Sequence, residues 1–369
     1  MKKNIFELFA VTALGLESVC ARELKDLGIK SQVCKGGVAF YGGLEQLYKA
    51  NLWLRTASRV LVRLGSFGCK DFPDLYQKAL RLPWGRFVKP DTDLQIKASS
   101  SRSRLQHTGR IVETVESAAH RALGRATDSG AGLRQLILVR FEDNRCVVSV
   151  DSSGPLLHRR GYRHMVGAAP LRETLAAGIL MLLDWDARTP LVDPMCGSGT
   201  FVVEGALMGM RRAPGTAREF AFMQWPRYRP GLWHVLQTQA RSAEQSCLPP
   251  LLGYDRDPDV IDAAAGNASR AGVAAVTQFG KAELGEGRFP ERPGFIMCNP
   301  PYGGRLGRDV RLTGLYRRLG EFYRSSGGVW QGAVLCPVGP LAKSLGEGFD
   351  CIGLLNNGGI DVGLYKVSL

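Results

Sequence analysis

The length, composition and charge of this 369-residue chain exclude several classes of protein. It is long enough for two or three domains, each with its own core. A content of 45% hydrophobic and 22% charged residues is ordinary for a globular protein. No stretch approaches the roughly 18 apolar residues of a membrane span, and Glu7 interrupts the apolar start that a signal peptide needs. With nine cysteines and no CxxC pair, we expect reduced thiols and a cytoplasmic location.

The positive charge is concentrated in the N-terminal part of the chain. Residues 1–165 contain 27 Lys and Arg against 15 Asp and Glu, a net charge of +12, whereas the remaining residues contain 21 against 19, a net charge of +2. Such a distribution is typical of a nucleic-acid-binding module. A basic surface that only aids solubility would give the same count.

The first 65 residues predict a small α/β unit. Apolar residues at helical spacing between Leu16 and Leu27 end at Gly28, which favours a helix that stops there. The other expected elements are strands over 4–12 and 60–64, two short strands around Gly36-Gly37, and a helix over 44–54. The order β-α-β-β-α-β is the ferredoxin-like arrangement.

Residues 66–153 predict a second α/β unit. Its expected elements are a helix after Asp71, a strand over 94–98, a long helix over 108–123, and strands over 136–140 and 146–150. A basic, turn-rich stretch follows, and we interpret residues 154–169 as a linker between domains.

Residues 170–369 predict a doubly wound parallel sheet. Short apolar runs end at Asp193, Asp255 and Asn299, and a loop or helix follows each. Two further apolar runs flank Asn356-Asn-Gly-Gly359, a hairpin pattern that predicts an antiparallel last strand. The aromatic-rich insertion at 213–247 could contact RNA bases, but we expect it to form a small satellite core.

The first chemically informative segment is Asp193-Pro-Met-Cys-Gly-Ser-Gly-Thr200, which joins a strand to a helix. Glycines 197 and 199 permit a tight turn and a close approach of the backbone to a ligand. The helix N-terminus offers free N–H groups to a carboxylate or phosphate. The segment matches neither GxGxxG nor the phosphate-binding GxxxxGK[ST] pattern, so a nucleoside triphosphate site is not expected.

An acidic residue follows the next predicted strand. Asp255 is placed to accept hydrogen bonds from a ribose diol, although a helix N-cap is the alternative role for such a residue. Asp257 lies directly before Pro258 and is better placed to be that N-cap. We therefore interpret Asp255 as a ligand contact.

The segment Asn299-Pro-Pro-Tyr302 predicts a site for an aromatic amine. The side-chain oxygen of Asn299 and the carbonyl of Pro300 can both accept from an –NH2 group, and Tyr302 offers a ring on which a base can stack. Two acceptors that pull on the amine hydrogens would localise its lone pair toward a methyl donor. This chemistry requires no metal, and we expect none.

These motifs resemble those of the class I methyltransferase family that carries an N-terminal THUMP domain. The resemblance rests on DPMCGSGT, GYDRDP and CNPPYGGRLG in this order, and it covers nearly the whole chain. It is strongest to the RlmL-type enzymes, which make N2-methylguanosine in large-subunit ribosomal RNA. The implied fold is α/β: a Rossmann-like methyltransferase sheet over 170–369, preceded by a ferredoxin-like unit over 1–65 and a THUMP domain over 66–153.

The resemblance also implies roles for individual residues. The target amine would be held by Asn299, Pro300, Pro301 and Tyr302. S-adenosylmethionine would be bound by Asp193, Pro194, Met195, Cys196, Gly197, Ser198, Gly199, Thr200, Asp255, Arg256, Ala282, Glu283 and Asn299. The candidate RNA contacts in the basic half are Arg102, Arg104, Arg159, Arg160 and Arg163. The sequence departs from the family where an Asp usually lies near the adenine, because Lys281-Ala-Glu283 occupies that place.

Several alternatives remain. The Asn-Pro-Pro-Tyr pattern also serves adenine-N6 methylases of DNA or RNA, and a transfer-RNA guanine-N2 methyltransferase would use the same motifs. A C5-cytosine methylase would need a thiolate, but Cys298 precedes Asn299 on a strand, where successive side chains point to opposite faces. We expect Cys298 to be a buried core thiol. A non-catalytic RNA-binding assembly factor is the alternative of a different class. The sequence does not indicate an oligomeric state.

Overall fold

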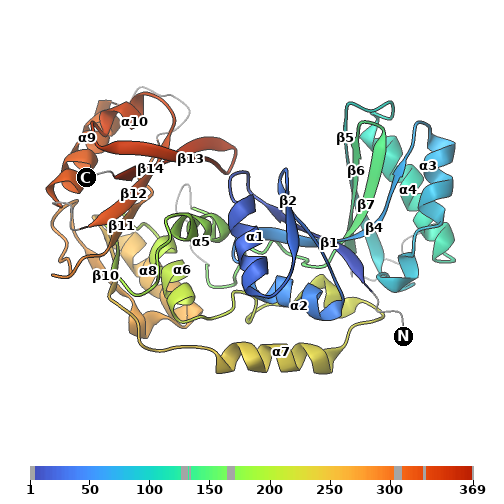
Figure 1. Ribbon diagram of the computed structural model, residues 1–369, viewed down its shortest axis with the longest axis horizontal. Coiled ribbons are helices and arrows are strands. Elements are labelled where there is room, and N and C mark those ends of the chain that lie inside the picture. Colours follow the sequence, from blue (N-terminus) through green and yellow to red (C-terminus); the bar gives the residue numbers. More distant parts are fainter. Residues whose placement is uncertain are drawn as a thin grey trace.

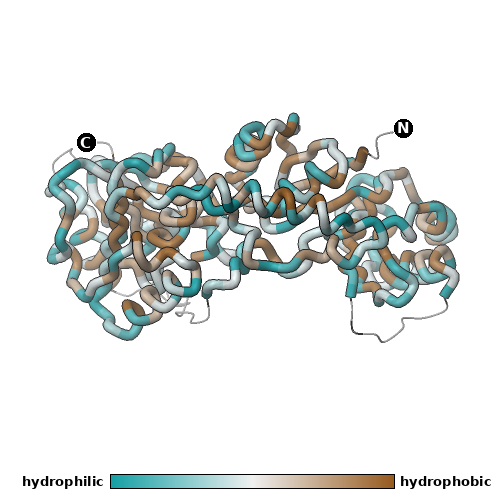
Figure 2. Tube along the Cα trace, turned by 90° about the horizontal axis from the view of Figure 1, so that it is seen from below, coloured by the Kyte–Doolittle hydropathy of each residue, from teal (hydrophilic) through white to brown (hydrophobic). Residues whose placement is uncertain are grey.

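The computed structural model describes residues 5–125, 132, 134–163, 171–302, 310–326 and 330–367. The molecule is elongated, and each end contains a seven-stranded sheet (Figure 1). Apolar segments lie inside both ends and hydrophilic segments lie on their outside (Figure 2). Within the described ranges, no helix has the length and apolar character that crossing a membrane requires.

The first sheet has the strand order β2-β3-β1-β4-β7-β6-β5. Its strands are β1 (Phe6–Thr12), β2 (Ser31–Cys34), β3 (Gly37–Gly42), β4 (Ala57–Gly68), β5 (Asp93–Ser101), β6 (Arg134–Glu142) and β7 (Arg145–Asp151). With α1 (Glu17–Asp26) and α2 (Leu44–Trp53), the first four strands form the predicted ferredoxin-like order. Because β4 pairs with β1 on one side and β7 on the other, both N-terminal units share one continuous sheet. The expected boundary at residue 65 falls inside β4.

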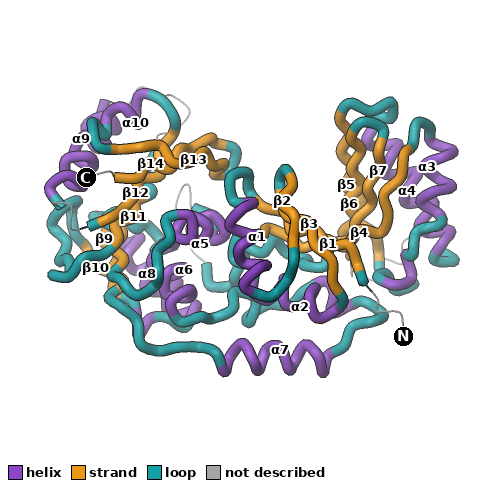
Figure 3. The backbone as a smooth tube through the Cα atoms, in the orientation of Figure 1, coloured by secondary structure: helices purple, strands orange, loops and turns teal. Residues whose placement is uncertain are grey.

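Helices cover one face of this first sheet. The long helices α3 (Phe72–Leu80) and α4 (Thr108–Ala122) run along one side of β5–β7 (Figure 3). The strands bury alternate residues: β1 buries Leu8 and Ala10, while Phe9 between them faces away from the core. The opposite face therefore remains open to a partner.

The second sheet has the order β10-β9-β8-β11-β12-β14-β13. Its strands are β8 (Leu191–Asp193), β9 (Leu251–Asp255), β10 (Gln278–Lys281), β11 (Phe295–Cys298), β12 (Gln331–Pro337), β13 (Phe349–Asn357) and β14 (Ile360–Val367). The first five strands in this order are parallel, and β14 pairs antiparallel with both β12 and β13. The doubly wound sheet and its antiparallel end are confirmed. The chain reverses its direction of winding between β8 and β11, where such sheets bind ligands.

Both faces of the second sheet are buried. Phe295 and Met297 of β11 pack in one core, whereas Ile296 and Cys298 pack in another on the opposite face. The helices of this half are α5 (Glu173–Leu182), α6 (Thr200–Gly209), α8 (Pro258–Ala271), α9 (Val310–Ser325) and α10 (Pro340–Ser344), and short 3-10 helices occur at Trp84–Arg86, Ala221–Gln224 and Ala274–Val276. Cys298 is fully buried beside Tyr316, as predicted for a core thiol.

The aromatic insertion connects the two halves of the molecule. It contains α7 (Pro230–Ser242), which lies beneath α2 in Figure 1. The Phe222 ring stacks on Tyr48 of α2 at a centroid distance of 4.4 Å, and the Trp225 indole donates to Gln135 Oε1 of β6 at 2.7 Å. The expectation of a separate satellite core is therefore wrong, because these rings belong to the N-terminal core. Being buried, Phe222, Trp225 and Trp233 are also not available to stack on RNA bases.

Candidate functional site

Three predicted ligand residues meet at one edge of the second sheet. Asp193 ends β8, Asp255 ends β9, and Asn299 follows β11. Since β8 pairs in parallel with both β9 and β11, the carboxyl ends of all three strands lie at the same edge. The sequence predicted this convergence, and the switch point of the sheet lies between Asp193 and Asn299.

The loop after β8, residues 193–199, is held by backbone hydrogen bonds, and we call it the glycine loop. Asp193 Oδ1 accepts from the Met195 N–H at 3.1 Å, and the Cys196 N–H donates to the Tyr254 carbonyl at 2.8 Å. Asp255 Oδ2 accepts from the Gly197 N–H at 3.0 Å. The end of β9 therefore fixes the shape of the loop.

The glycine loop has a packed side and an open side. Gly199 has φ +79°, and a Cβ there would lie 2.8 Å from the Phe279 ring and 3.0 Å from Ala264. A Cβ on Gly197, at φ +49°, would meet no atom within 4 Å. Gly199 is also the N-cap of α6, so the first N–H groups of that helix face the same region. The open side therefore suits a ligand that carries a carboxylate.

A cavity of about 690 Å³ borders the glycine loop, and we call it the cofactor cavity. It is lined by Pro194, Met195, Asp255, Arg256, Ala282, Glu283, Leu284, Pro301, Leu312, Gly314, Leu315, Arg317 and Arg318. The predicted adenine-side residues Ala282 and Glu283 thus lie in the same cavity as Asp255. The α9 residues that line this cavity were not predicted from the sequence, because no motif marks the face of a helix that packs beside the end of a strand.

Asp255 is a positioning residue as well as a candidate ligand contact. Its two oxygens accept from the backbone N–H groups of Gly197 and of Asp257, the latter at 3.1 Å. Asp257 is the N-cap of α8, as predicted, and accepts from the Asp259 N–H at 3.0 Å. A carboxylate has lone pairs beyond these two bonds, so the expected contact with a ribose stays a prediction.

Asp193 lies in an environment that favours a positively charged ligand. Burial raises the pKa of this carboxyl well above its usual range, and the negative charge of Asp255 raises it further. Only the Met195 N–H acts in the opposite direction, and no described lysine or arginine offsets the shift. A cationic group bound beside the loop would restore the ionised carboxylate.

Asn299 and Tyr302 are coupled directly. The Tyr302 hydroxyl donates to Asn299 Oδ1, which fixes the amide with its oxygen toward the tyrosine. Burial raises the pKa of Tyr302, so the hydroxyl stays protonated and remains a donor. The Pro301 carbonyl accepts from Tyr316 at 3.3 Å, which holds the motif against α9. One lone pair of Asn299 Oδ1 is left for a substrate amine.

A second cavity, of about 560 Å³, lies beside Tyr302, and we call it the arginine cavity. It is lined by His158, Arg159, Arg160, Gly161, Arg163, Arg172, Glu173, Tyr302, Asn357, Gly358 and Ile360. Pro301 borders the cofactor cavity and Tyr302 borders the arginine cavity. The Asn-Pro-Pro-Tyr segment therefore separates the two.

Two of the predicted RNA-contacting arginines are structural. Arg160 is 5% exposed, and its guanidinium donates to the carbonyls of Leu157 and Arg55 and lies 3.5 Å from Glu204. It links the two halves of the molecule and is not accessible to RNA. The predicted RNA contact of Arg160 is therefore wrong, because Glu204 already neutralises the arginine charge in the interior.

Arg163 supports the start of α6, directly after the glycine loop. Its guanidinium donates to Thr200 Oγ1 at 2.6 Å and forms an ion pair with Glu173 at 3.3 Å. The side chain is only 10% exposed. We therefore correct its predicted role from an RNA contact to support of the N-terminus of α6.

The other predicted RNA contacts lie on the surface. Arg102 is exposed, but it pairs with Asp143 at 2.8 Å and Glu142 at 2.9 Å, so its charge is partly neutralised. Arg104 and Arg159 are exposed. Their contact with RNA stays a prediction.

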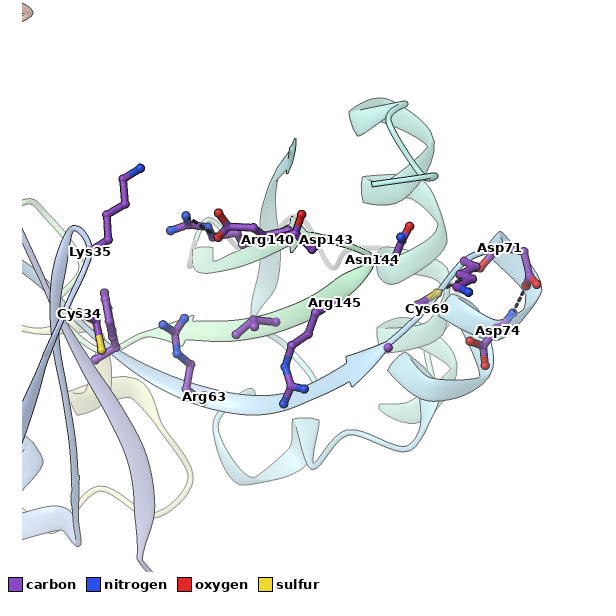
Figure 4. A pocket seen from close by; sticks show the side chains of 15 residues that line it. Cys34, Lys35, Arg63, Cys69, Asp71, Asp74, Arg140, Asp143, Asn144 and Arg145 are labelled. Atoms are coloured by element: carbon purple, nitrogen blue, oxygen red, sulfur yellow. Dashed lines mark hydrogen bonds and ion pairs between the residues drawn. The ribbon is translucent and has the colours of Figure 1, made fainter. Parts of the chain in front are cut away.

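The open face of the first sheet holds cations that the sequence analysis did not single out. A cavity of about 1150 Å³ lies between the β2–β3 turn and strands β4, β7 and β6, and we call it the basic cleft. Lys35, Arg63 and Arg140 line the cleft, and Asp71 and Asp74 lie at its end beside α3 (Figure 4). Arg140 forms an ion pair with Glu142 at 2.9 Å, so its charge is partly neutralised. The alternation of polar residues in β4 and β6 could have indicated this face.

The Arg63 guanidinium is held inside the basic cleft. It lies 4.4 Å from the centre of the Phe9 ring and donates to Ser149 Oγ at 2.8 Å. Burial lowers the pKa of Arg63, an effect that a bound anion would offset. In the described part of the chain, no group of three or more His, Cys, Asp and Glu side chains is placed to hold a metal ion.

Three family descriptions match successive parts of the chain. Residues 7–61 match the RlmL ferredoxin-like domain, residues 69–151 match the THUMP domain, and residues 160–335 match the RMKL-like methyltransferase domain.

Individual proteins match over nearly the full chain. A protein of Synechocystis sp. named as an RNA methyltransferase is 35% identical over 98% of this chain and 96% of its own length. The ribosomal RNA large subunit methyltransferase K/L of Methylococcus capsulatus is 36% identical over 97% of this chain. The chain spans 50% of the length of that relative.

Solved structures show the same architecture. A crystal structure of a methyltransferase complexed with S-adenosylhomocysteine superposes with a TM-score of 0.90 and 32% identity, over 100% of this chain and 99% of the other. A Listeria monocytogenes protein named as an N6-adenine-specific DNA methylase superposes with a TM-score of 0.89 and 30% identity, over 99% and 96%.

Proposed function

Since the chain belongs to the RlmK/L-type family of S-adenosylmethionine-dependent RNA methyltransferases, we propose that it transfers a methyl group to the exocyclic N2 amine of a guanosine in large-subunit ribosomal RNA. The observation that carries the proposal is that Pro301 lines the cofactor cavity and Tyr302 lines the arginine cavity, directly after Asn299 in the chain. An amine placed there would lie next to the glycine loop.

The residues of the cofactor cavity fit S-adenosylmethionine. Its ammonium group would neutralise the buried Asp193 carboxylate, and its carboxylate would meet the N–H groups at the start of α6. Asp255 and Glu283 would accept from the ribose and the adenine, with Leu284 and Leu315 packed on the ring. When bound, the cofactor supplies an electrophilic methyl group.

The acceptor half of the site is formed by the segment after β11. Asn299 Oδ1, with one lone pair engaged by Tyr302, offers the other to an amine hydrogen. The Pro300 carbonyl can accept the second hydrogen. Two such hydrogen bonds draw electron density onto the nitrogen, whose lone pair is otherwise delocalised into the base, and so raise its nucleophilicity. The product proton leaves to solvent.

RNA is the partner that the charge distribution favours. The basic cleft offers Lys35, Arg63 and Arg140 on an open sheet face, and the N-terminal part carries a net charge of +12. We propose that the cleft holds the phosphate backbone of a segment distant from the modified nucleotide. Such contacts position RNA without reading its sequence.

The choice of guanine N2 rests on the family rather than on the site. The site chemistry described above serves any exocyclic amine on a purine. The name of the Listeria relative favours adenine N6 as the second candidate, whereas the K/L relatives carry ribosomal RNA in their names. The two candidates differ in the product nucleoside.

The test is mass spectrometry of nucleosides from ribosomal RNA of a deletion strain, followed by methylation of that RNA with the purified full chain. We expect the strain to lack one N2-methylguanosine in the large-subunit RNA and the protein to restore it. Loss of N6-methyladenosine instead would show that the target base is adenine. If isothermal titration detected no binding of S-adenosylmethionine while RNA still bound, a non-catalytic role would replace both.

Asn299→Ala tests the catalytic assignment. Removal of the amine acceptor should lower kcat by about 100-fold to 1000-fold, with binding of S-adenosylmethionine nearly unchanged. Tyr302→Phe is the matched control, because it keeps the ring and removes only the hydroxyl that orients Asn299. It should retain far more activity than Asn299→Ala, and normal turnover by the Asn299 variant would refute the mechanism.

A further inference from the structure

The arginine cavity contains more positive charge than the fold uses. Arg163 is neutralised by Glu173, and Arg160 lies against Glu204. Arg159 and Arg172 also line the cavity, but they are exposed, and neither guanidinium has a hydrogen-bond or ion-pair partner among the described residues. Two cations that line the same cavity as Tyr302 therefore lack a counterion in the described part of the chain.

The pKa of the His158 imidazole reflects its burial and the positive charges around this cavity. Burial lowers its pKa to about 4, and the charges of Arg172, Arg159, Arg160 and Arg163 act in the same direction. These four cations all favour the neutral form of the imidazole. The ring is therefore neutral near pH 7 and can donate one N–H without adding charge.

A helix terminus adds to the same field. Arg172 is the N-cap of α5, and Glu173 occupies its first turn. The N-terminal end of a helix carries a partial positive charge, and its first N–H groups lack intrahelical acceptors. The unpaired arginines and the neutral histidine therefore favour an anion in this cavity, and the Glu173 carboxylate, which accepts from its own backbone N–H, offsets part of the helix charge.

The location of the cavity limits what this anion can be. Tyr302, whose ring is the proposed platform for the target base, lines the cavity. Among the described lining residues the one acidic side chain is Glu173, which is paired with Arg163. A base on that ring remains joined through its ribose to a phosphate. Guanidinium groups bind phosphate oxygens through pairs of parallel hydrogen bonds, which suits two arginines around one phosphate.

We propose that the arginine cavity binds the backbone phosphate adjoining the methylated nucleotide, with Arg159 and Arg172 as its cationic ligands and His158 as a neutral donor. The inference rests on the proposed function for the position of the base, but it concerns phosphate and not the identity of the base. Arg159 and Arg172 are positioning residues, since they hold the nucleotide and do not touch the reacting amine.

The experiment compares nucleosides with their 5′-monophosphates. Dissociation constants of guanosine and guanosine 5′-monophosphate are measured by ligand-observed NMR with the full chain saturated with S-adenosylhomocysteine. We expect the monophosphate to bind at least about tenfold more tightly, the effect of one good charge-assisted contact. Adenosine and its monophosphate should give a similar ratio, because the ratio reports phosphate.

The variant Arg159→Gln/Arg172→Gln should bring this ratio close to one while leaving nucleoside and cofactor binding unchanged. The double variant Arg159→Lys/Arg172→Lys should retain part of the preference, because it keeps the charge and loses the paired geometry. The matched control Arg188→Gln/Arg241→Gln removes two exposed arginines that lie outside the cavity, and it should behave like the wild type.

The outcomes separate this proposal from the proposed function. A wild-type ratio near one, or an unchanged ratio in the Gln variant, would overturn the phosphate site. Binding of inorganic phosphate as tight as that of the monophosphate would also overturn it, since the site would then serve free anions. Asn299→Ala should be strongly impaired in methyl transfer. If this variant keeps the wild-type ratio of nucleoside to 5′-monophosphate dissociation constants, the phosphate site is supported independently of catalysis.

Discussion

The two seven-stranded sheets of this protein differ in which of their parts a ligand can reach. The first sheet has helices on one face and leaves cations such as Arg63 and Arg140 on the other. The second sheet is buried on both faces, and β11 alternates between two cores. Asp193, Asp255 and Asn299 meet at the carboxyl ends of its central strands, where a ligand can reach them.

This difference matches two kinds of ligand. An open face spreads charge over a large area and suits a long polyanion held by many weak contacts. A strand edge places a few side chains on rigid elements and suits a small molecule that must be oriented closely. The comparison predicts that changes at the strand edge are severe and local, and that changes on the open face are modest and depend on salt.

The largest effect is expected at the strand edge. Gly199→Ala places a methyl group 2.8 Å from the Phe279 ring at a positive φ, so the glycine loop must move. We expect the affinity for S-adenosylmethionine, measured by isothermal titration, to fall by about 100-fold, as for a displacement of about 1 Å at a site.

Gly197→Ala is the matched variant, because its methyl group would meet no protein atom. Its φ of +49° still costs about 1–2 kcal/mol of stability for an alanine, but no packed group has to move, so the affinity for S-adenosylmethionine should fall much less than in Gly199→Ala. If both variants bound the cofactor normally, the glycine loop would not be the cofactor site, and the contrast between the sheets would fail.

The next effect concerns the segment that joins the two sheets. Trp233 of α7 is buried in the N-terminal core, with its ring 6.0 Å from Tyr48 and 5.4 Å from Phe222. Trp233→Ala should lower the free energy of unfolding by about 3 kcal/mol or more, as measured by urea denaturation. Val235→Ala on the exposed side of α7 is the control and should change it little. Equal losses would mean that α7 does not pack as described.

A smaller effect is expected on the open face. Lys35→Gln/Arg63→Gln/Arg140→Gln removes three cations from the basic cleft. Affinity for single-stranded RNA should fall by about tenfold near 0.15 M salt, and the salt slope should decrease by about two, or about 0.7 for each phosphate contact. Fluorescence anisotropy at several salt concentrations measures both.

The control for the cleft is Lys25→Gln/Arg81→Gln/Arg121→Gln, which removes the same charge from exposed positions on the helical side. Binding of the cofactor should be unchanged in both triple variants. A loss of RNA affinity in the control equal to that in the cleft variant would show that total charge, and not the open face, determines binding.

The smallest effect concerns the pH dependence of stability, through His158 of the arginine cavity. The pKa of His158 is lowered to about 4 in the folded protein, whereas a histidine of the unfolded chain binds a proton below about pH 6.5. Between these values the unfolded state holds more protons, so this residue lowers the free energy of unfolding as pH falls from about 6.5 to about 4.

His158→Gln should remove that contribution. The difference between the melting temperatures at pH 7 and pH 5 should be a few degrees smaller in the variant than in the wild type, as followed by circular dichroism. An unchanged difference would mean that burial and the neighbouring arginines do not lower the pKa of His158.

Much of the fold was predictable because it depends on local pattern. Apolar runs followed by Asp193, Asp255 and Asn299 predict parallel strands whose ends meet, and Asn356-Asn-Gly-Gly359 predicts the final hairpin. The N-cap at Asp257 and the buried thiol of Cys298 were also predicted correctly. Each depends on the geometry of a single strand, turn or helix end.

The arginines show where local pattern fails. Arg159 and Arg160 are adjacent in a basic stretch, yet one is exposed and the other lies against Glu204 in the interior. Nothing in the sequence near residue 160 identifies a glutamate more than forty residues away as its partner. Charge alone therefore predicts a basic surface, but not which cations lie on it.

What the sequence by itself determined is the chemistry at the strand edge, because the spacing of its motifs is set by the period of strands and turns. Only the tertiary structure decided that the aromatic insertion joins the N-terminal core, that Arg160 and Arg163 are structural, and that Arg172 and His158 line the same cavity as Tyr302. These outcomes depend on contacts between segments far apart in the chain, where burial and the pairing of charges determine which side chains remain free to bind.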